Sequence, residues 1–221
     1  MARPRWRRGA AHGAGDHPGG ADPTVRASLG VMGEPLVRAR HLKTTLAAAD
    51  RSGARDAIRA ALPPGLPAAI ELANGFDWLP AENDVALVRS IHGALGDAGH
   101  DAFSRGVIRE SFEGPLLGPL IGVALRLFPG GLMAWAHWIP RGWALVFREC
   151  GEWKVEGVGP GAVDLQLGWL PPICVQDSVW PTSVASSTSA ILDLARVRGT
   201  LRLTGLDPAT RTASYRMRWE A

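Results

Sequence analysis

The most constraining feature of this sequence is a change in the spacing of its apolar residues within the segment 130–169. Up to Cys150 these residues recur at helical spacing, whereas after Gly151 they alternate with polar residues. The first pattern is typical of a buried helix, and the second of strands with one buried face. We therefore predict a long buried helix, kinked at Pro140, that ends at Gly151, because glycine readily adopts the left-handed conformation that terminates helices.

The remainder of the C-terminal half is predicted to contain strands and one helix. Alternating runs on either side of Gly159-Pro160-Gly161 predict a hairpin. A helix opened by Pro181 follows, and two more alternating runs, separated by a turn near Asp207, come last. Because strands paired in hairpins form an antiparallel sheet, the predicted fold class is α+β, an N-terminal helical part followed by a β-β-α-β-β antiparallel sheet.

The N-terminal half carries mainly helical patterns. Pro80 is predicted to lie in the first turn of a helix, where proline costs no hydrogen bond. The predicted helices span 41–50, 54–62, 66–73, 80–95 and 97–112. The segment 115–128 is nearly all apolar but has only fourteen residues. A membrane-spanning helix needs roughly 20 residues, so we predict a buried central helix and no membrane span.

The charge of the chain gives no reason to expect a nucleic-acid partner. Its net charge is only +3 at pH 7, and the excess lies near the start, at Arg3, Arg5, Arg7 and Arg8. Nucleic-acid-binding domains instead carry basic patches on the folded surface. We therefore expect no nucleic-acid binding.

The first residues differ in composition from the rest. The segment 1–33 is rich in Gly, Ala, Arg and Pro without apolar periodicity, so we predict a disordered tail before a single domain over 34–221. The tail lacks the apolar stretch of a secretory signal. Cys150 and Cys174 do not form a metal-binding pattern. We expect a cytoplasmic protein with two buried reduced thiols; a disulfide between them is the alternative.

No motif in the sequence points to catalysis. It has neither a Walker phosphate-binding loop nor a nucleophile elbow of the form G-x-S-x-G. The one glycine-rich match, from Gly157 to Ala162, precedes a strand rather than a helix, so it is interpreted as a turn. His92 and His100 are expected at the surface or at helix ends, because metal-ligand spacing is absent. We predict no catalytic and no metal-binding residues.

Large aromatic residues on the predicted long helix and the following strand define a candidate ligand pocket. Its residues are Trp135, His137, Trp138, Arg141, Trp143 and Trp153. Such rings either line a site for a flat apolar or aromatic molecule or simply fill the core. His137 could ligate haem or bind an anion together with Arg141. Alternatively, it satisfies the carbonyl that Pro140 leaves free, or it faces solvent at the kink.

Three arginines in the last two predicted strands define a candidate partner surface. They are Arg202, Arg216 and Arg218. Because alternate residues of a strand share one face, these side chains are predicted to point the same way. They either contact an acidic partner or phosphates, or belong to a solvated sheet face.

Residues at the joints of these elements resemble a known family. They are Leu62-Pro63, Trp78-Leu79-Pro80, the run from Trp143 to Phe147 followed by Gly151, the run from Trp153 to Val155, and Trp219. The pattern, over about 41–219, resembles an uncharacterised myxobacterial family related to 4-vinyl-reductase-type domains. These in turn resemble haem nitric-oxide-binding domains and core subunits of vesicle-tethering complexes. The resemblance implies a ligand-binding or sensory fold.

Two departures from the family pattern affect the expected cofactor. Vinyl-reductase-type domains carry a cysteine pair in the last hairpin, where this chain has Ala213 and Ser214. The haem-binding relatives carry a Tyr-x-Ser-x-Arg signature for the haem propionates. The only tyrosine here, Tyr215, is followed by Arg216-Met217 and does not match. Haem is therefore disfavoured, and the cofactor or ligand is unknown.

Two functions are consistent with these observations. The first is a non-enzymatic small-molecule-binding or sensory domain of bacterial signalling, with its pocket between the helix 130–150 and the sheet. The second is a protein–protein adaptor without a ligand, resembling the tethering subunits and able to form a homodimer. An enzyme is the third and least favoured, because no acid–base or nucleophile group is apparent.

Overall fold

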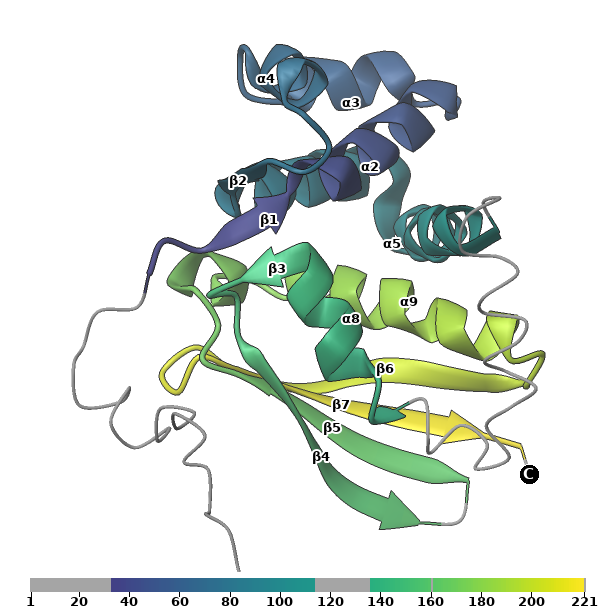
Figure 1. Ribbon diagram of the computed structural model, residues 1–221. Helices are drawn as coiled ribbons and strands as arrows, with labels where there is room; N and C mark the ends of the chain where they lie inside the picture. Colours follow the sequence, from purple (N-terminus) through teal and green to yellow (C-terminus); the bar gives the residue numbers. More distant parts are fainter. Residues whose placement is uncertain (1–32, 114–135, 160, 221) are drawn as a thin grey trace, which may run out of the picture. The chain divides into compact units, whose positions relative to one another are not determined.

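The computed structural model describes residues 33–113, 136–159 and 161–220 (Figure 1). The chain divides into the units 1–32 and 33–221, and every described residue belongs to the second. The predicted tail over 1–32 and the predicted central helix 115–128 lie outside the described residues. Within those residues, no helix is both long enough and apolar enough to cross a membrane.

The N-terminal part is mainly helical, as predicted. Its helices are α2 (Ala39–Arg51), α3 (Arg55–Ala61), α4 (Leu66–Leu72) and α5 (Glu82–Glu113). The long helix α5 is interrupted at Gly96, whose φ of 66° and ψ of 178° are not helical. The sequence predicted a boundary between two helices at this position, and glycine is the residue that adopts a positive φ most cheaply.

A small antiparallel sheet in this region was not predicted. It has three strands in the order β2-β1-β3: β1 is Leu36–Arg38, β2 is Trp78–Pro80 and β3 is Phe147–Arg148. The fully buried Val37 pairs with Leu79 on one side and with Phe147 on the other. The prediction that Pro80 opens a helix is wrong, since Pro80 ends β2. Strands this short show no readable alternation.

Of the predicted long helix, the structure describes residues 136–150. Helix α8 spans Ile139–Val146, with Pro140 in its first turn, and a turn at 137–138 separates it from the helical Ala136. The chain leaves the helix at Phe147 because this residue pairs with Val37 in the small sheet. The prediction that the helix reaches Gly151 is therefore wrong.

Gly151 nevertheless has the predicted backbone conformation. Its φ is 94°, and a Cβ atom there would lie 2.8 Å from the carbonyl oxygen of Gly168. It forms the turn between β3 and β4 rather than the end of a helix. Both the positive φ and the close approach of the neighbouring strand require a glycine.

The C-terminal half forms a four-stranded antiparallel sheet in the order β4-β5-β7-β6, which confirms the α+β class. The strands are β4 (Glu152–Gly159), β5 (Ala162–Gly168), β6 (Gly199–Asp207) and β7 (Thr212–Trp219). The 3-10 helix η1 (Pro172–Val175) and helix α9 (Val179–Leu194) connect the two hairpins. The hairpins join through β5 and β7, where Leu165 faces Tyr215.

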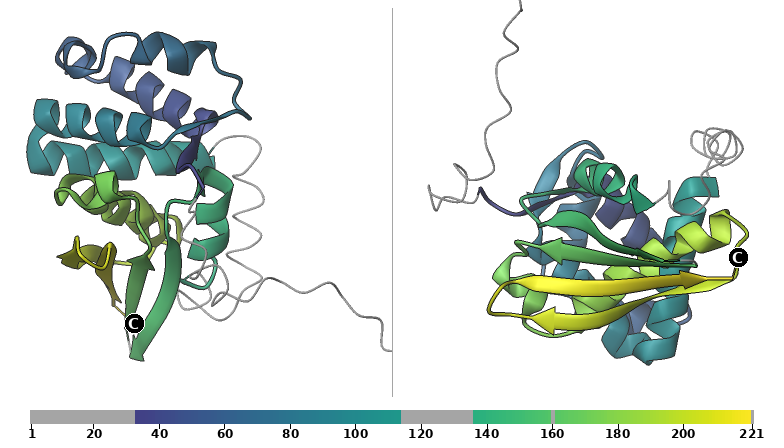
Figure 2. Two further views of the ribbon diagram at one scale, coloured as in Figure 1. Left: turned by 90° about the vertical axis from the view of Figure 1, so that its left-hand side faces the viewer. Right: turned by 90° about the horizontal axis from the view of Figure 1, so that it is seen from below.

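The two faces of this sheet have different surroundings. Helices cover one face, and Figure 2 shows the other face uncovered by described elements. Leu165, Tyr215 and Met217 point to the covered face and are at most 2% exposed. Arg202 and Arg216 point to the other face and are exposed. The alternation in the sequence therefore assigned both faces correctly.

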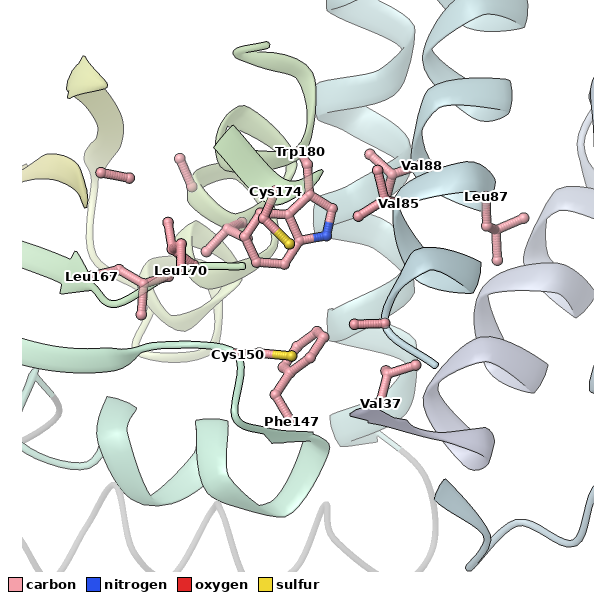
Figure 3. Packing of buried hydrophobic residues seen from close by; sticks show 14 of the residues in the cluster. Val37, Val85, Leu87, Val88, Phe147, Cys150, Leu167, Leu170, Cys174 and Trp180 are labelled. Atoms are coloured by element: carbon pink, nitrogen blue, oxygen red, sulfur yellow. The ribbon is translucent and has the colours of Figure 1, made fainter. Parts of the chain in front are cut away.

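The core connects the helical part to the sheet. Figure 3 shows Trp180 of α9 between Val85 and Val88 of α5 on one side and Leu170 on the other. The cysteines Cys150 and Cys174 are free and buried in this cluster. Burial raises the pKa of the Cys150 thiol to about 12, so this thiol is protonated at neutral pH.

Candidate functional site

A cavity of about 370 Å³ lies among α2, α5, α8 and α9. Its wall is largely apolar, and its volume is within the range of roughly 300–1,000 Å³ that is typical of small-molecule sites. The apolar side chains in the wall are Val88, Ile91, Phe103, Val107, Ile108, Trp138, Ile139, Trp143, Leu145, Val146, Phe147, Trp180, Val184, Ile191 and Leu194.

Helix α8 supplies one wall of the cavity through its helical periodicity. Ile139, Trp143 and Val146 are spaced by four and three residues, so they lie on one side of the helix. All three line the cavity. The sequence predicted this stripe, although it placed the stripe on a longer helix.

An aromatic cluster of Trp143, Phe147 and Trp180 forms one end of the cavity wall. The rings of Trp143 and Phe147 are stacked with centroids 4.2 Å apart. Trp180 meets both edge-on, at 6.0 Å from Trp143 and 6.1 Å from Phe147. Trp143 also contacts Trp153 of β4 at 5.8 Å. Helix α8 thus contacts the four-stranded sheet through these two rings.

A buried carboxylate adjoins the aromatic cluster. Asp84, in the first turn of α5, is only 3% exposed. Its Oδ2 accepts a hydrogen bond of 2.9 Å from Trp180 Nε1. Its Oδ1 lies 3.3 Å from His41 Nε2. This distance is short enough for an ion pair, but the two atoms are not aligned for a hydrogen bond. The positive end of the helix dipole favours an anion here, yet Oδ1 accepts no hydrogen bond within the described part of the chain.

His100 presents a second buried polar atom to the cavity. It is 2% exposed, and its Nε2 has no hydrogen-bond partner among the described residues. Its ring meets His92 edge-on at 5.3 Å. Burial, and secondarily His92, lowers the pKa of His100 from its ordinary value of 6.5, so its imidazole is neutral at pH 7. The expectation that His100 lies at the surface is wrong.

Hydroxyl groups make the wall near His100 more polar. The Oγ atoms of Ser104 on α5 and Ser183 on α9 are 3.3 Å apart. Both side chains line the cavity. Small residues of this kind let α5 and α9 approach closely, because they fill little space between the helix backbones. The sequence showed the run of small residues in α9 but did not indicate that α5 packs against it.

The predicted pocket residues are only partly brought together. Trp138, Arg141 and Trp143 line the cavity, whereas His137 is exposed and outside the described lining. Trp153 is buried under Trp143 and does not reach the cavity. The guanidinium of Arg141 lies 4.7 Å over the ring of Trp138. Trp135 lies outside the described residues.

The polar lining residues were not predicted. They are His41, Thr45, Asp84, His100, Ser104, Ser183, Ser187 and Thr188. One signal for Asp84 was present in the sequence. It is four residues before Val88 and seven before Ile91, on the stripe that faces inward. A charged residue on a buried stripe indicates a special environment.

The candidate partner surface is a separate site on the open face of the sheet. Arg202, Arg216 and Arg218 are all exposed there. Arg216 binds Asp164 of β5 through two hydrogen bonds of 2.6 and 2.9 Å. This pairing lowers the pKa of Asp164. Arg202 faces Arg216 across the β6–β7 ladder, so like charges lie side by side.

Comparison with known proteins identifies similar folds but no sequence family. No family model and no curated protein matches the chain. A solved H-NOX variant from K. algicida, in the Fe(II) unliganded form, matches with a TM-score of 0.57 at 6% identity, covering 83% of this chain and 97% of its own. The chain has the H-NOX fold. A second match is an oxygen-binding H-NOX domain related to soluble guanylate cyclases.

The second H-NOX structure matches with a TM-score of 0.54 at 7% identity, covering 83% of this chain and 95% of its own. These identities are far too low to transfer a ligand, so the likeness concerns the fold alone. The expected resemblance to haem nitric-oxide-binding domains is confirmed at that level.

H-NOX neighbours contain heme, so the cavity can be tested against that group. The unpartnered Nε2 of His100 has the chemistry of an iron ligand. The two carboxylates of haem, however, require cations, and the buried carboxylate of Asp84 carries the same sign of charge. Among the described lining residues, the one guanidinium, that of Arg141, already lies over Trp138. These residues do not fit haem.

Proposed function

We propose that this chain is a sensory domain of bacterial signalling that binds a small apolar or aromatic molecule in the cavity between α5, α8 and α9. It acts without catalysis and is related to the vinyl-reductase-type branch of this fold. The observation that carries the proposal is a largely apolar cavity of about 370 Å³ whose lining residues Asp84, His100 and Trp143 each have a buried polar atom without a hydrogen-bond partner among the described residues.

The polar atoms favour a ligand over a simple packing defect. A buried polar atom without a hydrogen bond costs about 1–3 kcal/mol. Asp84 Oδ1, His100 Nε2 and Trp143 Nε1 are in this situation within the described residues, and all three residues line the cavity. A ligand that forms a hydrogen bond with any of these atoms recovers this cost. The apolar wall then contributes binding through burial of the ligand's hydrocarbon surface.

The polar residues do not form a catalytic group. In the described part of the chain, neither His41 nor His100 is hydrogen-bonded to a hydroxyl or thiol that could act as nucleophile. Ser104 is instead paired with Ser183. Binding is therefore the proposed role.

The experiment compares two variants of α9 with the wild type. Thr188 lines the cavity, whereas Thr182 is exposed on the same helix and outside the lining. We expect saturable calorimetric binding of n-propylbenzene to the wild type and to Thr182→Trp, and weaker binding to Thr188→Trp, because the indole occupies part of the cavity. Mass spectrometry of the natively purified protein should detect a co-purifying molecule that Thr188→Trp lacks.

If the wild-type protein binds neither n-propylbenzene nor a co-purifying molecule, a protein–protein adaptor without a ligand becomes the better proposal. That second function is favoured by the exposed arginine row of β6 and β7. Two apolar side chains, Leu72 and Phe76, are also 87% and 79% exposed. A stoichiometric partner complex, weakened by Arg202→Ala or Arg218→Ala, would support it.

A further inference from the structure

We propose that the Asp84 end of the cavity binds the ammonium group of a small apolar amine. This inference rests on the proposed ligand-binding function and names the class of ligand. It combines three features of that end of the cavity: a buried carboxylate, an oxygen without a hydrogen bond, and an aromatic wall.

The charge of Asp84 is incompletely compensated. Asp84 is only 3% exposed. A carboxylate this deeply buried requires a positively charged or hydrogen-bonding partner. From α9 it receives one neutral donor, the indole Nε1 of Trp180. From α2 it receives His41 at 3.3 Å, without hydrogen-bond alignment. No lysine or arginine of the described residues forms an ion pair with it.

The two cysteine thiols near Asp84 add no positive charge. Asp84 contributes to the raised pKa of the Cys150 and Cys174 thiols, which lie in the adjoining core. Both thiols are therefore protonated and neutral at pH 7. The compensating cation is thus left to His41 or to a ligand.

The aromatic cluster suits a cation in the same place. All three rings of the cluster line the cavity, and Trp180 donates a hydrogen bond to Asp84. His41 meets the Phe147 ring at 5.8 Å, which places Phe147 beside the His41–Asp84 pair. Faces of aromatic rings attract ammonium groups electrostatically, most strongly where water is excluded. A carboxylate beside an aromatic wall is a combination that recognises organic cations.

The apolar part of the cavity wall defines the body of the ligand. Beyond Asp84 the α5 wall continues with Val88 and Ile91, and α8 faces it with Ile139 and Val146. These side chains can pack only hydrocarbon. The ligand class is therefore a molecule with one ammonium group and an apolar or aromatic body. Anionic molecules are disfavoured, because Asp84 repels their charge.

Three probes with the same phenethyl body test this inference by calorimetry at pH 7. They are 2-phenylethylamine, which is cationic, n-propylbenzene, which is neutral, and 3-phenylpropanoate, which is anionic. We expect the amine to bind the wild type about tenfold or more tightly than n-propylbenzene, because charge-assisted hydrogen bonds are the stronger ones. The propanoate should bind more weakly than either.

Asp84→Asn assigns the amine preference to one side chain. Asparagine keeps the shape and an oxygen for Trp180, so the amine advantage should disappear while n-propylbenzene affinity is retained. Glu82→Gln is the matched control, since Glu82 is exposed in the same first turn of α5 and outside the lining. It removes the same charge and should leave the amine advantage intact.

The possible failures are distinguishable. Wild-type protein that binds n-propylbenzene but shows no preference for the amine overturns the inference and leaves the proposed function standing. Binding of none of the three probes, together with the absence of a co-purifying molecule, removes the proposed function as well. An amine advantage that survives in Asp84→Asn shows that the ammonium group binds elsewhere and also overturns the inference. The wild-type comparison needs no variant to fold.

Discussion

The indole Nε1 of Trp180 donates a hydrogen bond of 2.9 Å to Asp84 Oδ2, across the contact between α9 and α5. Both residues are almost completely buried, at 1% and 3% exposure. The bond therefore fixes the orientation of a carboxylate inside an apolar core. It also connects the helical part of the domain to the helix that covers the sheet.

Replacing Trp180 with phenylalanine tests the strength of this connection. The variant keeps an aromatic ring but leaves Asp84 Oδ2 without its donor, which should lower the free energy of unfolding by about 1–3 kcal/mol. Urea denaturation measures the change. Trp169→Phe is the control, because Trp169 is 50% exposed and should change stability by no more than about 0.5 kcal/mol. Equal losses in the two variants would contradict the assigned role of the bond.

Gly151 is predicted to tolerate no side chain. Gly151→Val should lower the free energy of unfolding by more than about 1 kcal/mol, because of the positive φ and because a Cβ atom would approach Gly168 O to 2.8 Å. Gly93→Ala should act in the opposite direction, raising stability by about 0.5–1 kcal/mol. Gly93 is inside α5 with open space around it. Chemical denaturation of both variants decides the matter, and similar effects would refute the prediction.

Trp143 is predicted to matter far more for stability than Arg216. Trp143→Ala removes ring contacts with Phe147, Trp153 and Trp180 and should cost about 3 kcal/mol. Arg216→Ala removes only a surface pair with Asp164, and such pairs contribute about 0–1 kcal/mol. Guanidinium denaturation compares the two. A larger loss in Arg216→Ala would mean that the two sheet faces are assigned wrongly.

His100 is predicted to make stability depend on pH. Burial lowers its pKa in the folded state below the ordinary 6.5, so below pH 6.5 the unfolded chain binds a proton that the folded chain does not. The free energy of unfolding should therefore decrease as the pH falls from 6.5 towards the lowered pKa. This part of the decrease should be absent in His100→Gln. Ser104→Ala removes a neutral buried group nearby and should keep the slope.

Haem is predicted not to bind. Titration of the protein with haem should give no saturable one-to-one Soret band. The carboxylate of Asp84 repels the haem propionates, and the guanidinium of Arg141, the one guanidinium among the described lining residues, already lies over the ring of Trp138. A saturable band that disappears in His100→Ala would overturn this prediction and identify the iron ligand. A band lost in His137→Ala would identify the exposed histidine instead.

Local sequence patterns were sufficient to predict the strands of the four-stranded sheet and the short N-terminal helices. Residues from Leu201 and from Ala213 alternate between buried and exposed positions, as in Tyr215 and Arg216. This alternation is a local property that specifies both the strand and its buried face. The same holds for Gly96 and Gly151, where glycine marks a positive φ.

The end of the helix at Trp143 depends on a contact that is distant in the sequence. Phe147 continues the helical spacing, but it pairs with Val37, more than one hundred residues earlier. The hydrogen bonds and burial of that long-range pair outweigh the local preference for helix. No window of neighbouring residues contains this information.

The cavity likewise depends on long-range contacts. Its polar end joins His41, Asp84 and Trp180, which come from three helices, and the sequence around any one of them does not indicate the other two. Local patterns establish which face of a helix is buried, but not what that face meets. The burial of Asp84, and with it the charge that selects a ligand, arises only when α2, α5 and α9 pack together, because desolvation is produced by neighbours distant in sequence.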